Sequence, residues 1–445
     1  MQHLSRLSLA LAFTAGLSAG LIAQEVPLRT AVRDRLNAES ADLLELYKHL
    51  HANPELSFHE EKTAARLAEE LRRAGCEVTT GVGKHGVVAV LKNGGGPVVL
   101  VRSDLDGLPV KEQTGLPYAS KVTTKDDSGA EVSVMHACGH DIHITCLVGV
   151  ARVLASQKKH WRGTLILIGQ PAEERGGGAR AMLKDGLFTR FPRPDFCLAL
   201  HDSAEIPAGM VEYTPGFAMA NVDSVDITVR GVGGHGAWPH TTKDPVVLAS
   251  QIVLALQTVV SREIRPGDPA VVTVGSIHGG SKHNIIPDEV KLQLTVRSYT
   301  DAVRRQTLDA IRRIVMGQAA AAGLPEDRLP LVNENVEFTA ATYNDPQLTA
   351  RLAKVFEELL GTDNVRTRPP SMGGEDFGEF GRTDPRIPIC MFGVGGVKRE
   401  VYEASRKDGK PLPSLHSAFW APDPEPTIKT GITAMTAAVL ELMAK

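Results

Sequence analysis

The sequence predicts an α/β fold in which a mixed, mostly parallel sheet flanked by helices is interrupted by a smaller inserted domain. Three observations support this. Short apolar runs alternate with helical segments up to about residue 200, a β-α-β-β-α-β order follows, and helix and strand patterns resume after residue 340. A chain of 445 residues is long enough for two or three domains.

The first part of the chain shows the pattern of buried parallel strands. Its apolar runs are rich in Val, Leu and Ile with little alternation, and they span residues 87–91, 98–101, 164–168 and 196–200. This is typical of strands that are covered on both faces. Helical periodicity is found at residues 30–50, 60–74, 141–157 and 178–185. The alternation predicts a doubly wound layer.

The pattern changes near residue 220. Strands are expected at residues 223–229, 271–277, 290–296 and 331–338, with helices at 245–262 and 302–322. This order predicts a ferredoxin-like unit. Afterwards we expect a helix at 347–360, a strand at 387–394 and a helix at 428–443. The predicted divisions are therefore 24–219 and 339–445 for the two parts of the main domain and 220–338 for the insertion.

The N-terminus resembles a cleaved secretory signal over residues 1–23. Arg6 precedes an apolar run at residues 7–21, and small residues follow up to Ala23. We expect export to the periplasm or the medium. A single membrane anchor is the alternative, but the run is short and has no basic flank. We expect no other stretch to form a stable membrane span.

Composition excludes several classes of protein. The net charge is −3 without a basic stripe and aromatic residues are 5%, so we expect no nucleic-acid partner. The five cysteines are odd in number and scattered, which does not fit a disulfide framework. At least one thiol must be free or bind a metal, and Cys138 is the candidate.

The strongest chemical signal is the segment Met135–His143, MHACGHDIH. It holds a cysteine, an aspartate and three histidines. Thiolate and imidazole are preferred ligands of zinc-like ions. We expect Asp141 to cap the helix that follows. A polar turn around a buried cysteine is the alternative, but the density of donors favours a metal site.

Other polar clusters follow predicted strands or lie in loops: Asp104 and Asp106, Glu173 and Glu174, His201 and Asp202, and His416. The carboxyl ends of parallel strands form the usual site of an open α/β sheet. Adjacent carboxylates diverge, so one can bind metal while the other faces substrate; a solvated helix start is the alternative. Such donors indicate hydrolysis by activated water with a carboxylate base. A Gly-x-Ser-x-Gly pattern occurs at residues 16–20, inside the predicted signal; beyond that segment, motifs for a serine nucleophile, a phosphate loop or a His-Glu-x-x-His helix are absent from the sequence.

Together these motifs resemble the aminoacylase/carboxypeptidase family of two-metal amidohydrolases, in the branch with hippurate hydrolases and plant auxin-conjugate hydrolases. The resemblance runs from about residue 40 to the C-terminus. Its matching segments are His51–Ser57, Asp104–Pro109, Met135–His143, Pro171–Glu174, Gly176–Ala179, Gly233–Gly236, Asn284–Pro287, Gly373–Phe377 and Leu415–His416. Two departures are Gly107 in place of alanine and a polar insertion at residues 121–133, which we expect to form a rim loop.

The resemblance implies a zinc-exopeptidase-like catalytic domain and roles for individual residues. Two divalent ions (Zn, Mn, Co or Ni) would be held by Cys138, His140, Glu174, His201 and His416. Glu173 would be the general base. The insertion would be a lid and dimerisation domain, with His235 polarising the scissile carbonyl from the partner subunit. Asn284 and Arg297 would hold the substrate carboxylate, a role that suits the planar guanidinium. Asp104 and Asp106 would orient ligands.

The predicted function is hydrolysis of the amide bond of an N-acyl amino acid or a related small amide or peptide by a homodimer. Metal-bound water would attack, with Glu173 taking the proton. One alternative is a di- or tripeptidase of the same family. Another is a binding protein that has lost catalysis, but such a protein should lack a ligand or the base, and none is missing here.

Overall fold

The computed structural model describes residues 11–444, with side chains placed from residue 30 onward except at residues 335–337. Its larger sheet has eight strands in the order β1-β2-β6-β3-β7-β18-β8-β17. These strands are β1 (Glu77–Val82), β2 (Gly86–Asn93), β6 (Gly163–Gln170), β3 (Val98–Asp104), β7 (Phe196–Pro207), β18 (Ile389–Val397), β8 (Val211–Tyr213) and β17 (Val365–Thr367). The four central strands, β6, β3, β7 and β18, are parallel, and β1 and β2 add antiparallel pairs at one edge. The predicted fold class is confirmed.

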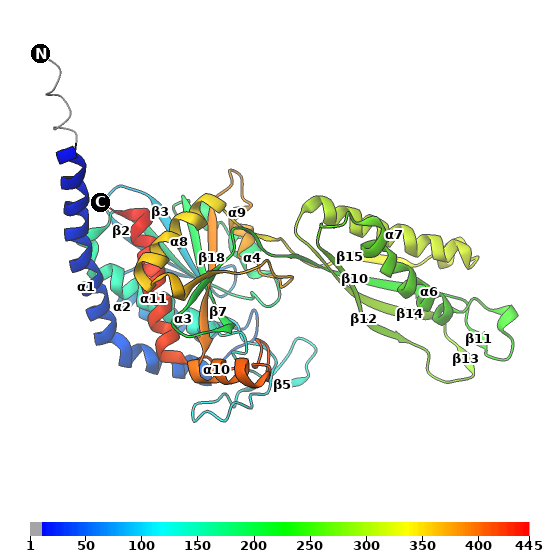
Figure 1. Cartoon of the computed structure of the whole chain (residues 1–445). Coiled ribbons are helices and arrows are strands. Elements are labelled where there is room, and N and C mark those ends of the chain that lie inside the picture. Colours follow the sequence, from blue (N-terminus) through cyan, green and yellow to red (C-terminus); the bar gives the residue numbers. More distant parts are fainter. Residues whose placement is uncertain (1–10, 445) are drawn as a thin grey trace, which may run out of the picture.

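Helices cover both faces of this sheet (Figure 1). One face packs against α1 (Leu11–Ala52), α2 (Glu61–Arg73), α3 (His140–Ser156), α8 (Pro346–Leu360) and α11 (Pro424–Met443). The other packs against α4 (Gly178–Lys184), α5 (Leu187–Arg190) and α9 (Gly378–Gly381). Within β6, Leu165 and Leu167 enter the first core while Ile166 and Ile168 enter the second. This explains why the strand is apolar at successive positions.

The inserted unit is a four-stranded antiparallel sheet in the order β12-β14-β10-β15. Its elements are β10 (Asn221–Arg230), α6 (Pro245–Thr258), β12 (Ala270–Gly279), β14 (Glu289–Ser298), α7 (Asp301–Ala321) and β15 (Leu331–Thr339). The two helices pack on the sheet around their own hydrophobic core. The predicted ferredoxin-like order is therefore present, in a lobe that extends away from the larger sheet (Figure 1).

A short two-stranded ribbon lies where the chain enters and leaves this lobe. It consists of β9 (Gly216–Met219) and β16 (Thr342–Asn344), which pair antiparallel. The predicted divisions after residues 219 and 338 lie beside this ribbon. We refer to residues 220–338 below as the lid.

Several elements were not predicted. The insertion at residues 121–133 contains the hairpin β4 (Thr123–Lys125) and β5 (Glu131–Ser133), and α10 (Arg399–Asp408) precedes His416. These elements are short and have no buried residue, so no apolar period indicates them. The helix predicted at 245–262 is α6 followed by one π-helical turn, η3 (Val259–Glu263).

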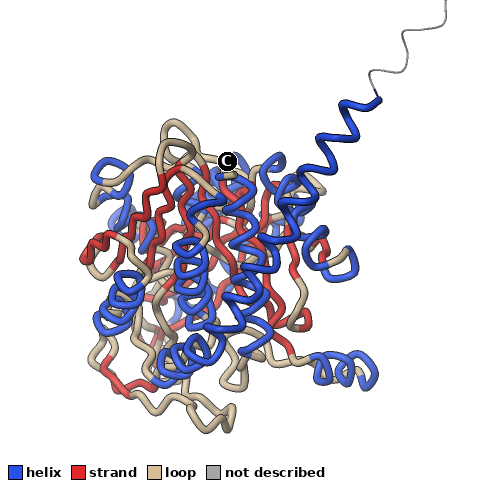
Figure 2. The backbone as a smooth tube through the Cα atoms, turned by 90° about the vertical axis from the view of Figure 1, so that its left-hand side faces the viewer, coloured by secondary structure: helices blue, strands red, loops and turns tan. Residues whose placement is uncertain are grey.

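The predicted signal lies only partly within the described residues, because residues 1–10 are outside them. From Leu11 the chain forms the first turns of α1, which extend away from the body (Figure 2). Contrary to the sequence expectation, one further stretch, Pro245–Glu263, is long and apolar enough to cross a membrane by length and composition alone. Its inner residues Leu248, Ile252 and Leu256 are buried against the lid sheet.

Candidate metal centre

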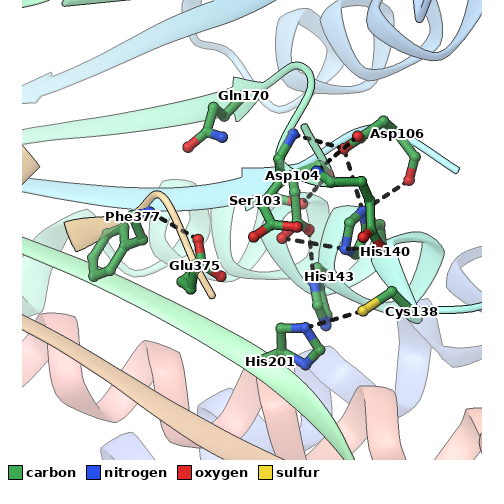
Figure 3. A network of polar contacts seen from close by, with 12 residues as sticks. Ser103, Asp104, Asp106, Cys138, His140, His143, Gln170, His201, Glu375 and Phe377 are labelled. Atoms are coloured by element: carbon green, nitrogen blue, oxygen red, sulfur yellow. Dashed lines mark hydrogen bonds and ion pairs between the residues drawn. The ribbon is translucent and has the colours of Figure 1, made fainter. Parts of the chain in front are cut away.

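The five predicted metal ligands come together at the carboxyl ends of the central strands. Cys138 lies in the turn before α3 and His140 is the first residue of that helix. Glu174 follows β6, His201 lies in β7, and His416 lies in the loop after α10. Figure 3 shows the side chains of Cys138, His140 and His201 facing one another.

The donor atoms of these five residues are close enough to share cations. Cys138 Sγ lies 3.5 Å from His201 Nε2 and 3.3 Å from His416 Nε2. Glu174 Oε1 lies 3.4 Å from His416 Nε2 and 3.9 Å from His140 Nε2. Two groups of them, Cys138-His140-His201 and Cys138-Glu174-His416, each have ligand atoms within 4.8 Å of one another, and a third group joins His140 and Glu174 to the proposed base Glu173. The arrangement has room for two neighbouring cations.

The tautomers of two histidines are set for metal binding. His140 Nδ1 donates to the backbone oxygen of Asp106 at 2.8 Å, and His201 Nδ1 donates to the backbone oxygen of Asp202 at 2.7 Å. With the proton on Nδ1, each Nε2 keeps its lone pair for a ligand bond. Both Nε2 atoms face the centre.

Two buried atoms at the centre have no hydrogen-bond partner among the residues that the structure describes. They are His140 Nε2 and Glu174 Oε1. Leaving a buried polar atom unpaired costs about 1–3 kcal/mol, and a bound cation would remove that cost for both. Thiolate, imidazole and carboxylate donors suit Zn, Mn, Co or Ni. The residues therefore fit a pair of divalent ions.

Asp106 and Asp104 form hydrogen bonds to residues that surround the metal centre. Asp106 Oδ1 accepts from the backbone N–H of Glu173 and Oδ2 from that of Glu174, both at 3.1 Å. Ser57 Oγ donates to Oδ2 at 2.6 Å. Asp104 Oδ1 accepts from His143 Nδ1 at 2.7 Å (Figure 3). Asp106 is thus placed to orient Glu173 and Glu174, whereas Asp104 contacts His143, which is not among the proposed ligands; the orienting role of both aspartates stays a prediction.

Glu173 lies beside the donors and lines the cavity, with 9% of its surface exposed. Burial raises the pKa of Glu173 well above its ordinary value, and the negative charges of Glu375, Glu174 and Asp376 add to this effect. A carboxyl group in such surroundings accepts a proton readily, as a general base must. A cation bound at Glu174 would oppose the shift.

A buried ionic cluster behind Glu173 was missed by the sequence analysis. Arg102 donates to Glu375 Oε1 at 2.8 Å, to Asp104 Oδ2 at 2.6 Å and to Gln170 Oε1 at 3.0 Å. Glu375 belongs to a segment that supported the family resemblance, but no role was assigned to it. The available signal was an arginine directly after the apolar run 98–101, because a buried arginine needs acidic partners.

The cavity at the centre has a volume of about 510 Å³ and lies between the two lobes. Besides four of the five donors, all but His140, it is lined by lid residues, among them Val222, Phe338 and Arg297. The Arg297 guanidinium donates to the backbone oxygen of Met372 at 2.7 Å. Arg297 is thus placed within the same cavity as Glu173.

Two predicted site residues, His235 and Asn284, lie away from the metal centre. His235 in β11 (Gly234–His235) pairs with Ile285 in β13 (Ile285–Ile286), and the backbone oxygen of Asn284 accepts from Gly236 N at 2.9 Å. Both side chains are exposed, and neither lines the cavity. They lie at the end of the lid that is distant from the larger sheet (Figure 1). Within one chain, the structure does not bring them to the metal centre.

The expectation that Asp141 caps α3 is wrong. The residue before the helix is Gly139, in a left-handed conformation with φ of 77°. A Cβ there would lie 2.4 Å from the Asp202 carboxylate, so only glycine fits. Asp141 lies in the first turn and accepts from His51 Nδ1 at 2.7 Å.

Sequence comparison identifies related proteins. The model of peptidase family M20/M25/M40 matches residues 100–406. Hippurate hydrolase from Campylobacter jejuni is 40% identical over 333 residues, which cover 74% of this chain and 82% of that protein. An IAA-amino acid hydrolase from Arabidopsis thaliana is 35% identical over 343 residues, which cover 77% of this chain and 75% of the relative.

Solved structures show the same fold. A candidate aminohydrolase from methicillin-resistant Staphylococcus aureus has a TM-score of 0.79 at 30% identity and covers 93% of this chain and 100% of its own. A dinuclear metal-binding peptidase of the M20 family from Bacillus subtilis has a TM-score of 0.71 at 27% identity. The match covers 92% of this chain and 100% of that peptidase. The resemblance predicted from the motifs is confirmed.

Proposed function

As the chain belongs to the M20/M25/M40 peptidase family and is a hydrolase of amide or peptide bonds, we propose that its substrates are N-acyl amino acids or closely related small amides. The observation that carries the proposal is the convergence of Cys138, His140, Glu174, His201 and His416 beside one further carboxylate, Glu173. Relatives named for hippurate and for IAA-amino acids support this substrate class.

The chain's own residues divide the chemistry among them. Two divalent ions held by the five donors would polarise the amide carbonyl and make water nucleophilic near neutral pH. Glu173 takes the proton of the attacking water and delivers it to the leaving nitrogen. Arg297, in the same cavity, pairs with the substrate's carboxylate through its planar guanidinium. The amide bond breaks to give a carboxylic acid and a free amino acid.

We propose further that the active unit is a homodimer formed through the lid. Large apolar side chains are exposed on the lid: Trp238, Val246, Val247, Leu254, Val260, Ile277 and Ile285. Strand β12 is an unpaired edge of the lid sheet, which is a surface that a second copy can extend. A dimer also gives His235 and Asn284 a route to a cavity that they do not reach within their own chain. There His235 would polarise the scissile carbonyl, and Asn284 would hold the substrate carboxylate together with Arg297.

Export remains a proposal that rests on residues 1–23 alone. N-terminal sequencing of protein recovered from the periplasm or the medium tests it. A mature chain that begins near residue 24 supports cleavage, and an intact N-terminus in the membrane fraction supports an anchor.

The substrate proposal is tested on purified protein by a panel of amides. Chelator-treated protein is reloaded with Zn, Mn, Co or Ni and assayed on N-benzoylglycine, N-acetylcysteine, an indole-acetyl amino acid, dipeptides and tripeptides. We expect activity to need metal and kcat/KM to be highest for an N-acyl amino acid. Higher kcat/KM for dipeptides or tripeptides would identify a peptidase. Binding of substrate without hydrolysis by metal-loaded protein would identify a binding protein.

A further inference from the structure

Two residues, one of them directly before the proposed base, have a backbone conformation that side chains disfavour. Ala172, which immediately precedes Glu173, has a φ of 49°, and Phe58 has a φ of 63°. For a residue other than glycine such a conformation costs on the order of 1–3 kcal/mol and persists only when the surroundings impose it. Something must therefore hold the chain at the point where it leaves β6 for Glu173.

A single buried oxygen contacts both strained residues. Glu60 Oε1 accepts from the backbone N–H of Ala172 at 2.7 Å and from that of Phe58 at 2.8 Å. Glu60 is fully buried and comes from the segment before α2, more than 100 residues from Ala172 in sequence. Its other oxygen, Oε2, has no hydrogen-bond partner among the described residues.

Together with Asp106, Glu60 accepts hydrogen bonds from three successive backbone N–H groups in the loop that carries Glu173. Glu60 accepts from Ala172, and Asp106 accepts from the next two backbone N–H groups, those of Glu173 and Glu174. The loop then folds back, because Gly176 N donates to the oxygen of Glu173 at 2.7 Å. Two buried carboxyl groups thus fix three consecutive backbone amides. The middle residue of the three is Glu173, the proposed base.

We propose that Glu60 is a positioning residue for Glu173. It holds Ala172 in the left-handed conformation that turns Glu173 toward the cavity and Glu174 toward the other metal ligands. This inference rests on the proposed function for the role of Glu173, but the conformation of the loop is independent of the substrate.

These two hydrogen bonds also indicate which chemical property of Glu60 is needed to hold Ala172 and Phe58. Both amides use Oε1, so one acceptor oxygen is sufficient and the negative charge is not required. Burial raises the pKa of Glu60 to about 7, with the charge of Asp106 adding to the effect, which fits a site that accepts the neutral acid. A glutamine at this position keeps the acceptor, and an alanine removes it.

The experiment compares four variants with the wild type: Glu60→Ala, Glu60→Gln, the double variant Glu60→Ala with Ala172→Gly, and Glu61→Ala. Glu61 is the adjacent exposed acid and serves as the matched control. Glycine at 172 adopts positive φ without support and therefore replaces the need for Glu60. For each variant, kcat and KM are measured on the best substrate of the panel, and Zn²⁺ affinity is measured by competition with a chelating dye.

We expect Glu60→Ala to lower kcat on the order of 100-fold with KM little changed, because a small displacement of a catalytic group is enough for such a loss. Glu60→Gln and the double variant should each recover at least about 10-fold of that loss, and Glu61→Ala should match the wild type. Zn²⁺ affinity should rank the variants in the same order as kcat, because displacement of the loop also moves the ligand Glu174. We expect a loss of about 10–100-fold in Glu60→Ala.

Two results would overturn the proposal. One is wild-type kcat and Zn²⁺ affinity in a folded Glu60→Ala protein. The other is a failure of both Glu60→Gln and the double variant to recover either quantity, which would assign Glu60 to general stability instead. If the wild type hydrolyses no amide of the panel, the proposed function fails, but the order of Zn²⁺ affinities still decides the role of Glu60.

Discussion

At the scale of single residues, Asp106 links the proposed base to the proposed ligands through its backbone and side chain. Its two side-chain oxygens hold the amides of Glu173 and Glu174, and its backbone oxygen holds the Nδ1 proton of His140. A change at this one position therefore reaches three groups around the metal centre without removing any donor atom.

We predict that Asp106→Asn weakens metal binding. The new amide group turns a donor toward the N–H of Glu173 or Glu174, so one of these loses its acceptor. Loss of such a partner typically costs 10–100-fold in affinity, and we expect about that loss for Zn²⁺ in a dye-competition assay. Asp363→Asn, at an exposed carboxylate, is the control. Unchanged affinity in the Asp106 variant would contradict the orienting role.

His51 forms a second buried charge cluster, with Glu112 and with Asp141, the residue that follows His140. Its Nδ1 donates to Asp141 at 2.7 Å and its Nε2 to Glu112 at 3.0 Å, with all three side chains buried. Burial by itself lowers the pKa of His51, but the hydrogen bonds to Asp141 and Glu112 reverse the effect and raise it to about 10. The folded state therefore holds a protonated imidazole.

This gives a prediction for stability against pH. Because the folded pKa is raised, the stabilisation is complete below the unfolded value of about 6.5 and is lost as pH rises toward 10. At pH 6 we expect His51→Gln to be less stable than the wild type by roughly 3–5 kcal/mol, since two buried acids lose their partner. Urea unfolding at pH 6, 8 and 9.5 should show this difference shrinking. For Thr362→Ala, at an exposed residue without a titratable group, the difference should stay constant, and a constant difference for His51 would refute the assignment.

Two parts of the proposed site have a local signal in the sequence, whereas the full ligand set, with Cys138 and His416 separated by 278 residues, came from the family resemblance. Cys138 and His140 lie two residues apart, and Glu173 and Glu174 directly follow a buried strand. Glu60, Arg102 and Glu375 were not given roles because their partners are distant: Arg102 and Glu375 are 273 residues apart. The partner of a buried charged residue can be identified only when the order of the strands in the sheet is known.

At the scale of elements, the hairpin β4–β5 borders the cavity. Asp127 in its turn forms a close ion pair with Arg175, which lines the cavity, and lies 3.3 Å from His59. Both partners of the Asp127–Arg175 pair are about half exposed. The insertion thus contacts one residue that lines the cavity, and the expected rim loop stays a prediction.

We predict that Asp127→Ala changes KM and leaves kcat unaltered. The pair is exposed to solvent and therefore weak, so the change in KM should stay within about 5-fold. Steady-state kinetics on the best substrate measures both quantities, with Glu131→Ala on β5 as the control. A loss of kcat beyond about 10-fold would show that the hairpin acts on the chemistry itself, against this account.

Elements differ in how far they could be predicted. The long buried strands β3, β6 and β7 were evident because both faces are apolar. The three-residue strands β8 and β17 were not, because they are defined by pairing with each other and, for β8, with β18 rather than by any local pattern. Capping of α3 was misassigned because the need for glycine at 139 comes from Asp202, a distant residue.

At the scale of the whole molecule, the lid separates two of the predicted site residues from the cavity. If a second copy supplies His235 and Asn284, then the exposed apolar surface of the lid must be buried in the dimer. Leu254 on α6 is 72% exposed, the largest exposed fraction among the described large apolar side chains of the lid.

We predict that Leu254→Glu yields monomers, because it introduces a charge into an apolar interface. Sedimentation velocity should show a dimer for the wild type and a monomer for the variant, and kcat should fall with dissociation. Val401→Glu, at an exposed valine of α10, should remain dimeric. A wild type that is monomeric and fully active would contradict the dimer proposal.

The central claim is that five donors hold two ions and leave Glu173 free to move protons. Glu173→Gln tests it most directly, through the metal content per subunit and kcat measured on the same preparation. The account predicts two ions per subunit, as in the wild type and in the exposed Glu326→Gln control, with kcat reduced by about 10²–10⁴-fold or more. Wild-type kcat in Glu173→Gln, or loss of both ions with the single change, would contradict it.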